Sequence, residues 1–256
     1  MLEARALTKW YGGLLAVADV TFTVREGEVL GYVGPNGSGK TTTVNMLTGL
    51  VPPTSGGVWY RGRSIDADLV GFRREVGYVP EEPHLYPYLT GREHLELVAR
   101  LRRMDERIAA RRIEALLDLQ GLSAFRDMTM SLYSKGMRQK VLIAAALLHD
   151  PALLILDEPL SGLDAMSTLV LRQLMIELAA HGKALMYSSH ALETVERMCS
   201  RVLVLHQGRV VAHGGPDELR QTLRQDSFEA VFTELVSDVD PSETARDLLT
   251  AMRLGA

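Results

Sequence analysis

The chain has little cysteine, no strong excess of charge and no long apolar run. Cys199 is the only cysteine among 256 residues, so no disulfide can form within the chain. The formal net charge is −4, which gives no reason to expect nucleic acid as a partner. The longest purely apolar run, 141–148, is far shorter than the roughly 18 residues that a membrane-spanning helix needs. Because the first residues also lack the apolar stretch of a signal peptide, we expect a cytoplasmic chain that reaches a membrane only through a partner.

Residues 34–42 carry the most informative pattern, Gly-Pro-Asn-Gly-Ser-Gly-Lys-Thr-Thr. This pattern fits Gly-x-x-x-x-Gly-Lys-[Ser/Thr], the P-loop that holds nucleotide phosphates. An apolar strand at 29–33 precedes it and a helix from 41 to 50 follows it, as the motif requires. We expect its backbone amides and Lys40 to bind phosphates, and the Thr41 hydroxyl to bind Mg²⁺. The predicted phosphate-binding residues are Gly34, Pro35, Asn36, Gly37, Ser38, Gly39, Lys40, Thr41 and Thr42.

The rest of the pattern predicts an α/β fold, a P-loop NTPase core with a mostly parallel sheet. The predicted strands are 17–24, 29–33, 58–60, 152–156, 184–188 and 201–205, with a final hairpin at 202–211. An antiparallel β subdomain is expected on the N-terminal side, and a helical subdomain is expected at about 88–140. We expect an ATP-binding domain at 1–220 and a helical tail at 221–256.

Two helices are predicted inside the helical insert. Thr90-Gly-Arg-Glu93 has the form of a capping box, so a helix should begin there, with Leu95, Val98 and Leu101 as its apolar stripe. Asp105 is the expected N-cap of the next helix and Gly121 its end. The apolar face predicted for that second helix consists of Ile108, Ala115, Leu116 and Leu119.

Residues 153–158 form a second motif, four apolar residues that end in two acids. This is the form of a Walker B strand, whose carboxylates lie at the end of a buried parallel strand, where ligands bind in open α/β sheets. We expect Asp157 to hold Mg²⁺ and Glu158 to polarise a water molecule against the γ-phosphate. Taken alone, the segment also fits a solvated acidic turn.

Four further segments make the chain similar to the ATPase subunits of ABC transporters, from Tyr11 to about Gly215. Residues 131–139 resemble the signature motif of that family, and Ser161-Gly-Leu-Asp164 resembles its D-loop. His190 resembles the switch histidine beside the γ-phosphate, and Tyr11 matches the aromatic residue that stacks on adenine.

The resemblance implies that two ATPase domains enclose two ATP molecules. Each ATP then lies between the P-loop of one subunit and the signature motif of the other, where Ser134 and Gly136 meet the γ-phosphate. It also implies a membrane-spanning permease subunit as partner, a second ATPase domain of the same or a related chain, and a place on the cytoplasmic side of the membrane. No nucleic acid is expected.

Three positions depart from the common family pattern. Lys135 stands where the signature usually has glycine, and Met137 stands where it has glutamine. Lys135 either adds a charge near the phosphate or points into solvent. Glu81 replaces the usual glutamine that contacts Mg²⁺, and its carboxylate can also bind the ion. These departures, with the tail at 227–235, resemble the branch paired with ABC-2-type exporter permeases.

Purely structural roles are an alternative for several of these residues. Tyr11 also fits a core aromatic, and His190 also fits a residue that fills or caps a turn. The basic run 100–112 is either a solvated helix face or a surface that faces a permease. As alternatives to transport we keep a soluble ABC-type regulator acting on a ribosome or DNA, and a P-loop NTPase outside the family, such as a small GTPase.

Overall fold

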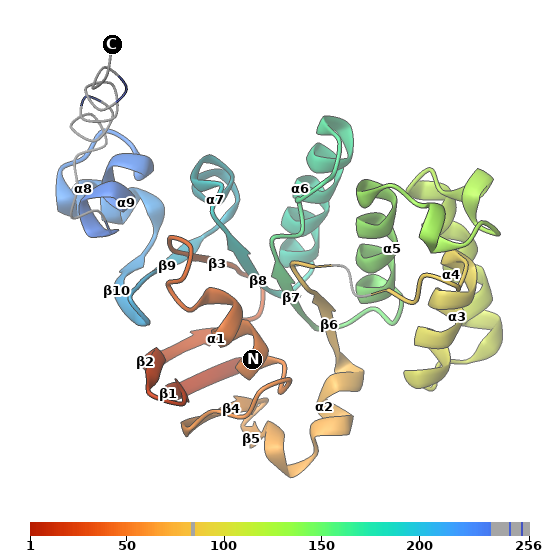
Figure 1. Cartoon of the computed structure of the whole chain (residues 1–256), viewed down its shortest axis with the longest axis horizontal. Coiled ribbons are helices and arrows are strands. Elements are labelled where there is room, and N and C mark those ends of the chain that lie inside the picture. The colour runs from red at the N-terminus through yellow and green to blue at the C-terminus, as the bar shows by residue number, and fades with distance from the viewer. Residues whose placement is uncertain (83–84, 237–245, 247–251, 253–256) are drawn as a thin grey trace.

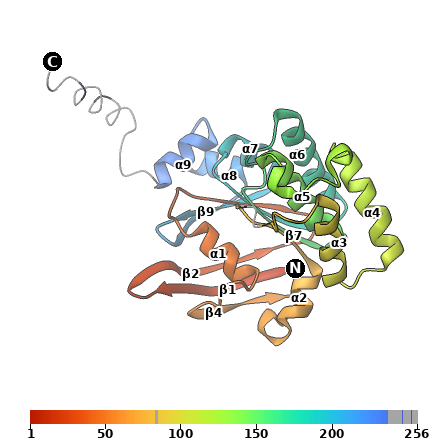
Figure 2. The ribbon, with the colours of Figure 1, turned by 45° about the vertical axis from the view of Figure 1, so that its right-hand side comes forward.

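Two β-sheets enclose the helix that follows the P-loop (Figures 1 and 2). We describe them from a computed structural model, which describes residues 1–82, 85–236, 246 and 252. In this part of the chain, a six-stranded sheet has the order β10-β9-β3-β8-β7-β6, and all neighbours are parallel except β10 with β9. A smaller antiparallel sheet has the order β2-β1-β4-β5. The predicted α/β fold, with its mostly parallel sheet and antiparallel β subdomain, is confirmed.

The elements have the following bounds. The strands are β1 Leu2–Tyr11, β2 Leu14–Val24, β3 Val29–Val33, β4 Ser55–Tyr60, β5 Arg63–Ser64, β6 Val76–Val79, β7 Leu153–Asp157, β8 Ala184–Ser189, β9 Arg201–His206 and β10 Arg209–Gly214. The α-helices are α1 Lys40–Leu47, α2 Leu69–Glu75, α3 Gly91–Leu101, α4 Glu106–Leu119, α5 Lys135–Leu147, α6 Ala165–Ala180, α7 Leu192–Met198, α8 Pro216–Leu223 and α9 Phe228–Val236. Short 3-10 turns cover Ile65–Ala67, Ser123–Phe125 and Met130–Leu132.

Helix α1 lies between the two sheets and has apolar contacts with both (Figure 2). Its buried side chains Val44, Met46 and Leu47 share a core with strands of the antiparallel and the parallel sheet. The sequence predicted that this helix would continue to residue 50, but it ends at Leu47. Gly49 has φ +68, a left-handed conformation that favours glycine and ends helices.

The other face of the parallel sheet is covered by α5, α6, α7, α8 and α9. Residue 220, the predicted end of the ATP-binding domain, lies inside α8. The next helix, α9, buries Phe228 and Val231 in the same core as the sheet strands. The tail is therefore packed on the domain as far as Val236, and the predicted tail residues 237–245, 247–251 and 253–256 lie outside the described residues.

Helices α3, α4 and α5 are here called the helical segment (residues 91–147). Helices α3 and α4 lie to one side of the sheets, and α5 packs on both the parallel sheet and these two helices (Figure 1). The capping box of Thr90 and Glu93 is present, and Asp105 caps α4 through bonds from two backbone amides. The second apolar face was predicted wrongly. Helix α4 buries its small or apolar side chains at every fourth position, namely Ala109, Ile113 and Leu117.

The physical reason is that α4 packs on one side only, against α3 and α5. One row of side chains is buried there. Of the four residues predicted for this face, Leu116 is partly buried against the same core, and the other three are exposed. Leu119 is 83% exposed and Ile108 is 43% exposed. Leu101, predicted for the stripe of α3, is also 65% exposed because it lies in the last turn, outside the contact with α4 and α5. Within the described residues, no helix combines the length and apolarity needed to cross a bilayer.

Candidate nucleotide-binding site

The predicted site residues meet at one edge of the parallel sheet. The P-loop follows β3, Glu81 follows β6, Glu158 follows β7 and His190 follows β8. Since these strands are parallel, their carboxyl ends share one edge, where open α/β sheets bind ligands. A cavity of about 550 Å³ lies there. It is lined by Leu14, Leu15, Ala16, Asn36, Gly37, Gly39, Lys40, Thr41, Thr42, Glu81, Asp157, Glu158 and His190.

The P-loop has the tight curvature that its glycines allow. Gly39, the N-cap of α1, has φ +102, and a Cβ atom there would lie 2.6 Å from the Ala16 carbonyl oxygen. A Cβ atom on Gly34 would lie 2.4 Å from the Leu205 carbonyl oxygen. Only glycine fits these two positions. The first turn of α1 contains no acidic residue, so its free backbone amides offer an anion site at the helix N-terminus.

Lys40 is folded back onto the P-loop. Its Nζ atom donates to the carbonyl oxygens of Gly34, at 2.7 Å, and Pro35, at 3.1 Å. Partial burial lowers the pKa of Lys40, while the carboxylates of Glu158, Asp157 and Glu81 act in the opposite direction. The ammonium group is thus held next to the cavity by neutral acceptors, and a phosphate can replace them as the stronger partner.

Asp157 ends β7 and is 1% exposed, yet neither of its carboxylate oxygens has a hydrogen-bond partner in the described part of the protein. Burial raises its pKa to about 6; the nearby Ser188 hydroxyl and the Lys40 charge act in the opposite direction, while the carboxylates of Glu81 and Glu158 add to the rise. An unpartnered buried carboxylate is costly unless a cation or donor meets it. The two free oxygens aimed at the cavity therefore fit a ligand of Mg²⁺.

Glu81 reaches the same place from β6. Its Oε2 atom accepts a hydrogen bond from the Thr41 hydroxyl at 3.4 Å, so Thr41, Glu81 and Asp157 line one side of the cavity. Among the described residues, no cluster of three or more His, Cys, Asp or Glu side chains is arranged to hold a metal on its own. An ion here would draw its remaining oxygen ligands from water and a bound nucleotide, which is how Mg²⁺ binds in phosphate sites.

Glu158 and His190 form a hydrogen-bonded pair that also lines the cavity. The Oε1 atom of Glu158 lies 2.7 Å from Nδ1 of His190 and accepts from the His190 backbone amide at 2.8 Å. The Ser189 hydroxyl donates to its other oxygen at 3.2 Å. Glu158 has φ +46, an uncommon conformation for a residue other than glycine, of the kind that accumulates at functional sites. The alternative of a solvated acidic turn is excluded, because Glu158 is 9% exposed.

Three residues at the cavity were missed by the sequence analysis. Leu14, Leu15 and Ala16 line it, but the second strand was predicted to begin only at Val17. The sequence did contain a signal for these residues. Gly12–Gly13, directly after Tyr11, marks a tight hairpin turn, so the second strand begins immediately after it, at Leu14. Tyr11 itself pairs with Leu14 across that hairpin and is 46% exposed, so it is not a core aromatic.

The signature residues lie apart from this cavity. Ser134 is the N-cap of α5 and accepts a bond from the Met137 amide, and neither Ser134 nor Gly136 lines the cavity. A Cβ atom on Gly136 would lie 2.6 Å from the Gly162 carbonyl oxygen of the D-loop. Lys135 does not point freely into solvent, because its Nζ atom donates to the Ser161 hydroxyl at 2.9 Å. Within one chain, the signature is thus packed against the D-loop, and the P-loop faces a separate cavity.

Comparison with known proteins agrees with this geometry. The family model described as "ABC transporter" matches residues 17–161. An uncharacterized ABC transporter ATP-binding protein of Nostoc sp. is 41% identical over 80% of this chain and 62% of its own length. The linearmycin resistance ATP-binding protein LnrL of Bacillus subtilis is 35% identical over 89% of this chain and 73% of its own length. The chain belongs to the ABC transporter family. It is an ATP-binding subunit of that family of ATPases.

Solved structures show the same fold. An ATP-binding subunit of an ABC transporter is 38% identical, has a TM-score of 0.87 and matches 92% of this chain and 99% of its own. A dimeric ATP-binding cassette in a post-hydrolysis state, bound to ADP and Pi, is 28% identical, with a TM-score of 0.78 over 84% of this chain and 98% of its own. The small-GTPase alternative is therefore wrong for this ABC subunit.

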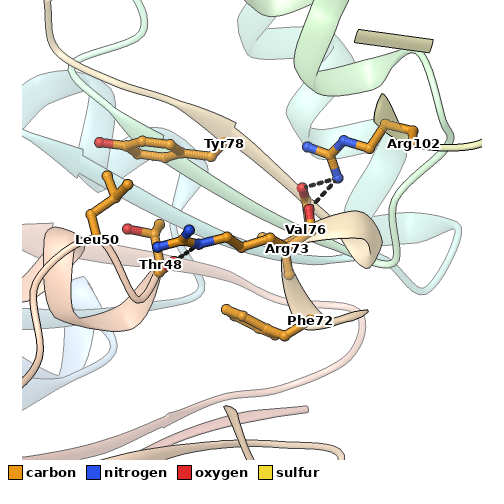
Figure 3. Close-up of a pocket in the computed structure, with 7 residues that line it drawn as sticks. All are labelled: Thr48, Leu50, Phe72, Arg73, Val76, Tyr78 and Arg102. Atoms are coloured by element: carbon orange, nitrogen blue, oxygen red, sulfur yellow. Dashed lines mark hydrogen bonds between the residues drawn. The ribbon is translucent and has the colours of Figure 1, made fainter. Parts of the chain in front are cut away.

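The ABC subunit has a second cavity, smaller and more apolar, at about 170 Å³ (Figure 3). It lies where the end of α1, helix α2, strand β6 and the end of α3 meet. Figure 3 shows Arg73 extending toward Thr48 and Leu50, with Tyr78 on one side of it and Phe72 on the other, and Arg102 next to Val76. The remaining lining residues are Thr48 and Val76.

Proposed function

We propose that this ABC subunit binds and hydrolyses MgATP between two copies or paralogues of the chain, and that dimer closure powers a separate membrane permease. The observation that carries the proposal is the convergence of Lys40, Asp157 and Glu158 on one cavity at the end of the parallel sheet. ATP hydrolysis needs hydrogen-bond donors that bind the phosphates, a ligand for the metal ion, and a base that accepts a proton from the attacking water.

The nine P-loop residues 34–42, including Lys40, are assigned to the phosphates. Thr41, Asp157 and Glu81 are assigned to Mg²⁺, which supplies charge neutralisation when bound. This assignment is supported by the unpartnered oxygens of Asp157 and by the bond between Thr41 and Glu81. Tyr11 is assigned to the adenine ring, because it is exposed beside the hairpin residues that line the cavity.

Glu158 is assigned as the residue that orients the attacking water and accepts its proton. His190 positions Glu158 through the 2.7 Å contact, and its side chain, 75% exposed, remains available to the γ-phosphate. Because hydrolysis of this kind rests on positioning and electrostatics, loss of Lys40 or Glu158 should be severe.

A second ATPase domain completes the site in this proposal. Ser134 and the Gly136 amide begin a 13-residue helix whose N-terminus suits a phosphate, yet they lie outside the cavity of their own chain. The dimeric cassette described with ADP and Pi supports the pairing of two such domains. ATP held between both faces then favours the closed dimer through its higher affinity for that state.

We also propose that the permease is an ABC-2-type exporter and that the chain works at the cytoplasmic side of the membrane. The relative named for linearmycin resistance supports export, because resistance to a small molecule is served by its removal. The three departures at Glu81, Lys135 and Met137 support the same branch. The substrate of transport is set by the permease.

Glu158→Gln tests this proposal. The variant should bind MgATP, lose nearly all hydrolysis and accumulate as a dimer in size-exclusion chromatography with light scattering, because closure no longer ends in hydrolysis. Glu177→Gln, the same change at an exposed glutamate outside the cavity, serves as the control and should behave like the parent chain. A fully active and monomeric Glu158→Gln protein would refute the assignment.

A further inference from the structure

We propose that Arg73 and Arg102 form a relay of hydrogen bonds that fixes the helical segment relative to the P-loop helix α1. In this role Arg102 is a positioning residue for Ser134, the residue offered to the nucleotide of the second subunit. The inference rests on the proposed function, since it concerns how the P-loop and the signature residue Ser134 of one chain are positioned relative to each other. We call these two side chains the arginine relay.

The first half of the arginine relay joins α2 to the end of α1. The Arg73 guanidinium donates to the carbonyl oxygens of Thr48, at 3.3 Å from Nε, and Gly49. Thr48 is the C-cap of α1, and Gly49 follows it in a left-handed conformation. The carbonyl groups at a helix C-terminus carry partial negative charge, so a guanidinium is a favourable partner for them. Helix α1 begins at Lys40, about 12 Å away along its axis.

The second half joins the helical segment to α2 and β6. Arg102 is the C-cap of α3, and its NH1 atom donates to the carbonyl oxygens of Arg73 and Val76, the latter at 2.8 Å. The same atom lies 2.9 Å from Nε2 of His149, just beyond the end of α5. Since arginine can only donate, His149 accepts with a neutral ring, and burial and the Arg102 charge lower its pKa to about 4.

Neither Arg73 nor Arg102 forms an ion pair that would account for its position. In the described part of the chain, no carboxylate lies within ion-pair distance of Arg73 or Arg102. Both side chains line the smaller cavity, and their guanidinium groups donate to backbone carbonyls beside it, as Figure 3 shows. Burial lowers the pKa of Arg102 to about 10, which marks the cost of keeping this charge there. Three acceptors surround the NH1 group of Arg102 and share its two hydrogens, and a charge that is desolvated among such acceptors points to a fixed connection.

The arginine relay affects the position of the signature residue Ser134. Helices α3 and α5 share one apolar core through Leu95, Ala99 and Val141, so they move together. Arg102 holds the far end of α5 through His149, and Ser134 caps its near end, about 20 Å away. Helix α5 also packs on the parallel sheet through Leu142, Ile143 and Ala146, so Arg102 helps to set the angle at which α5 lies on the sheet. A small change of that angle displaces Ser134 at the other end of α5, while the P-loop keeps its place.

The test measures two quantities on the full chain, the nucleotide Kd and kcat. Arg102→Met removes the second half of the relay, Arg73→Met removes the first half, and the double variant removes both. Arg112→Met is the matched control, because Arg112 on α4 donates to the Leu148 carbonyl at 3.0 Å, just after the end of α5, and makes no bond to α2 or β6. The Glu158→Gln versions of all four report MgATP-driven dimerisation.

We expect Arg102→Met to lower kcat about tenfold to a hundredfold and to weaken dimerisation by a similar factor. The nucleotide Kd of the monomer should change less than about twofold, because the P-loop cavity is untouched. The double variant should lose no more kcat or dimerisation than the more affected single variant. Breaking either half of the relay already breaks the connection, so breaking the other half should add nothing. Arg112→Met should keep the parent kcat.

Three results would overturn the relay. They are an unchanged kcat in Arg102→Met, equal losses in Arg102→Met and Arg112→Met, or additive losses in the double variant. If Arg102→Met does not fold, Arg73→Met decides the matter by the same criteria, because the Arg73 side chain is exposed. Failure of the parent chain to dimerise with ATP in its Glu158→Gln form instead contradicts the proposed function, so the two failures are distinct.

Discussion

Replacing Asp157 by asparagine should stabilise the nucleotide-free chain and at the same time remove its activity. The carboxylate is buried at the end of β7, and neither oxygen has a partner among the described residues. The folded protein therefore bears the cost of a desolvated negative charge until a cation arrives. Removing the charge removes this cost, and it also removes the proposed ligand of Mg²⁺.

The magnitude follows from the pKa of Asp157, which burial raises from 3.8 to about 6. Each pKa unit corresponds to 1.36 kcal/mol, so the charge costs at most about 3 kcal/mol of folding stability at neutral pH. For a carboxyl group whose pKa is raised on folding, the native state binds more protons than the unfolded state. The cost is therefore fully present above pH 6, and it disappears as the pH falls toward 4.

Urea unfolding at pH 7.5 and pH 4.5, without nucleotide or metal, tests this reasoning. We expect Asp157→Asn to raise the free energy of unfolding by up to about 3 kcal/mol at pH 7.5, and by much less at pH 4.5. MgATP should then stabilise the parent chain, by about 2.7 kcal/mol at 100 times its Kd, but not the variant. Asp105→Asn is the control, because Asp105 is an exposed N-cap outside the cavity and asparagine caps equally well. An Asp157→Asn variant less stable than the parent at pH 7.5 would refute the argument.

Three further predictions concern packing and the signature helix. Lys135→Met keeps the side-chain stem over Gly162 but loses the 2.9 Å bond to Ser161. The kcat should therefore fall, while the ATP Kd and the melting temperature stay nearly constant. An unchanged kcat would exclude a role for this bond. Phe228→Ala should cost about 3–5 kcal/mol in urea unfolding, because this fully buried ring joins α9 to the sheet core, and a loss below about 1 kcal/mol would show that α9 is not anchored there. Burial raises the pKa of Cys199 to about 12, so the native thiol should resist a disulfide reagent at pH 8 and react only after unfolding; rapid labelling of the folded chain would contradict its burial.

The sequence predicted best where a motif and its local structure coincide. Strand 29–33 has the predicted bounds, and the caps at Thr90 and Asp105 are present, because these features depend on neighbouring residues alone. The buried face of α4 could not be predicted in this way. Which of its apolar residues are covered depends on where α3 and α5 lie, and this is set by tertiary packing.

The same distinction applies to the site. Lys40, Asp157, Glu158 and Glu81 were predicted from motifs, and the parallel order of β6, β7, β8 and β3 explains why they meet. The environment of Lys135 was not predictable, because its acceptor Ser161 lies 26 residues away and reaches it only through the packing of α5 on the D-loop. The arginine relay was hidden for the same reason, since its acceptors are backbone carbonyls, which leave no trace in a sequence.

The most direct test of the central claim is an affinity purification of the tagged Glu158→Gln chain from detergent-solubilised membranes in the presence of MgATP. The account predicts that a multi-spanning membrane protein elutes in stoichiometric amount, and that this yield drops when Lys40→Ala is added to prevent nucleotide binding. Elution of ribosomes or other soluble material alone would contradict the transport function and favour a soluble regulator, while leaving the ATPase chemistry in place.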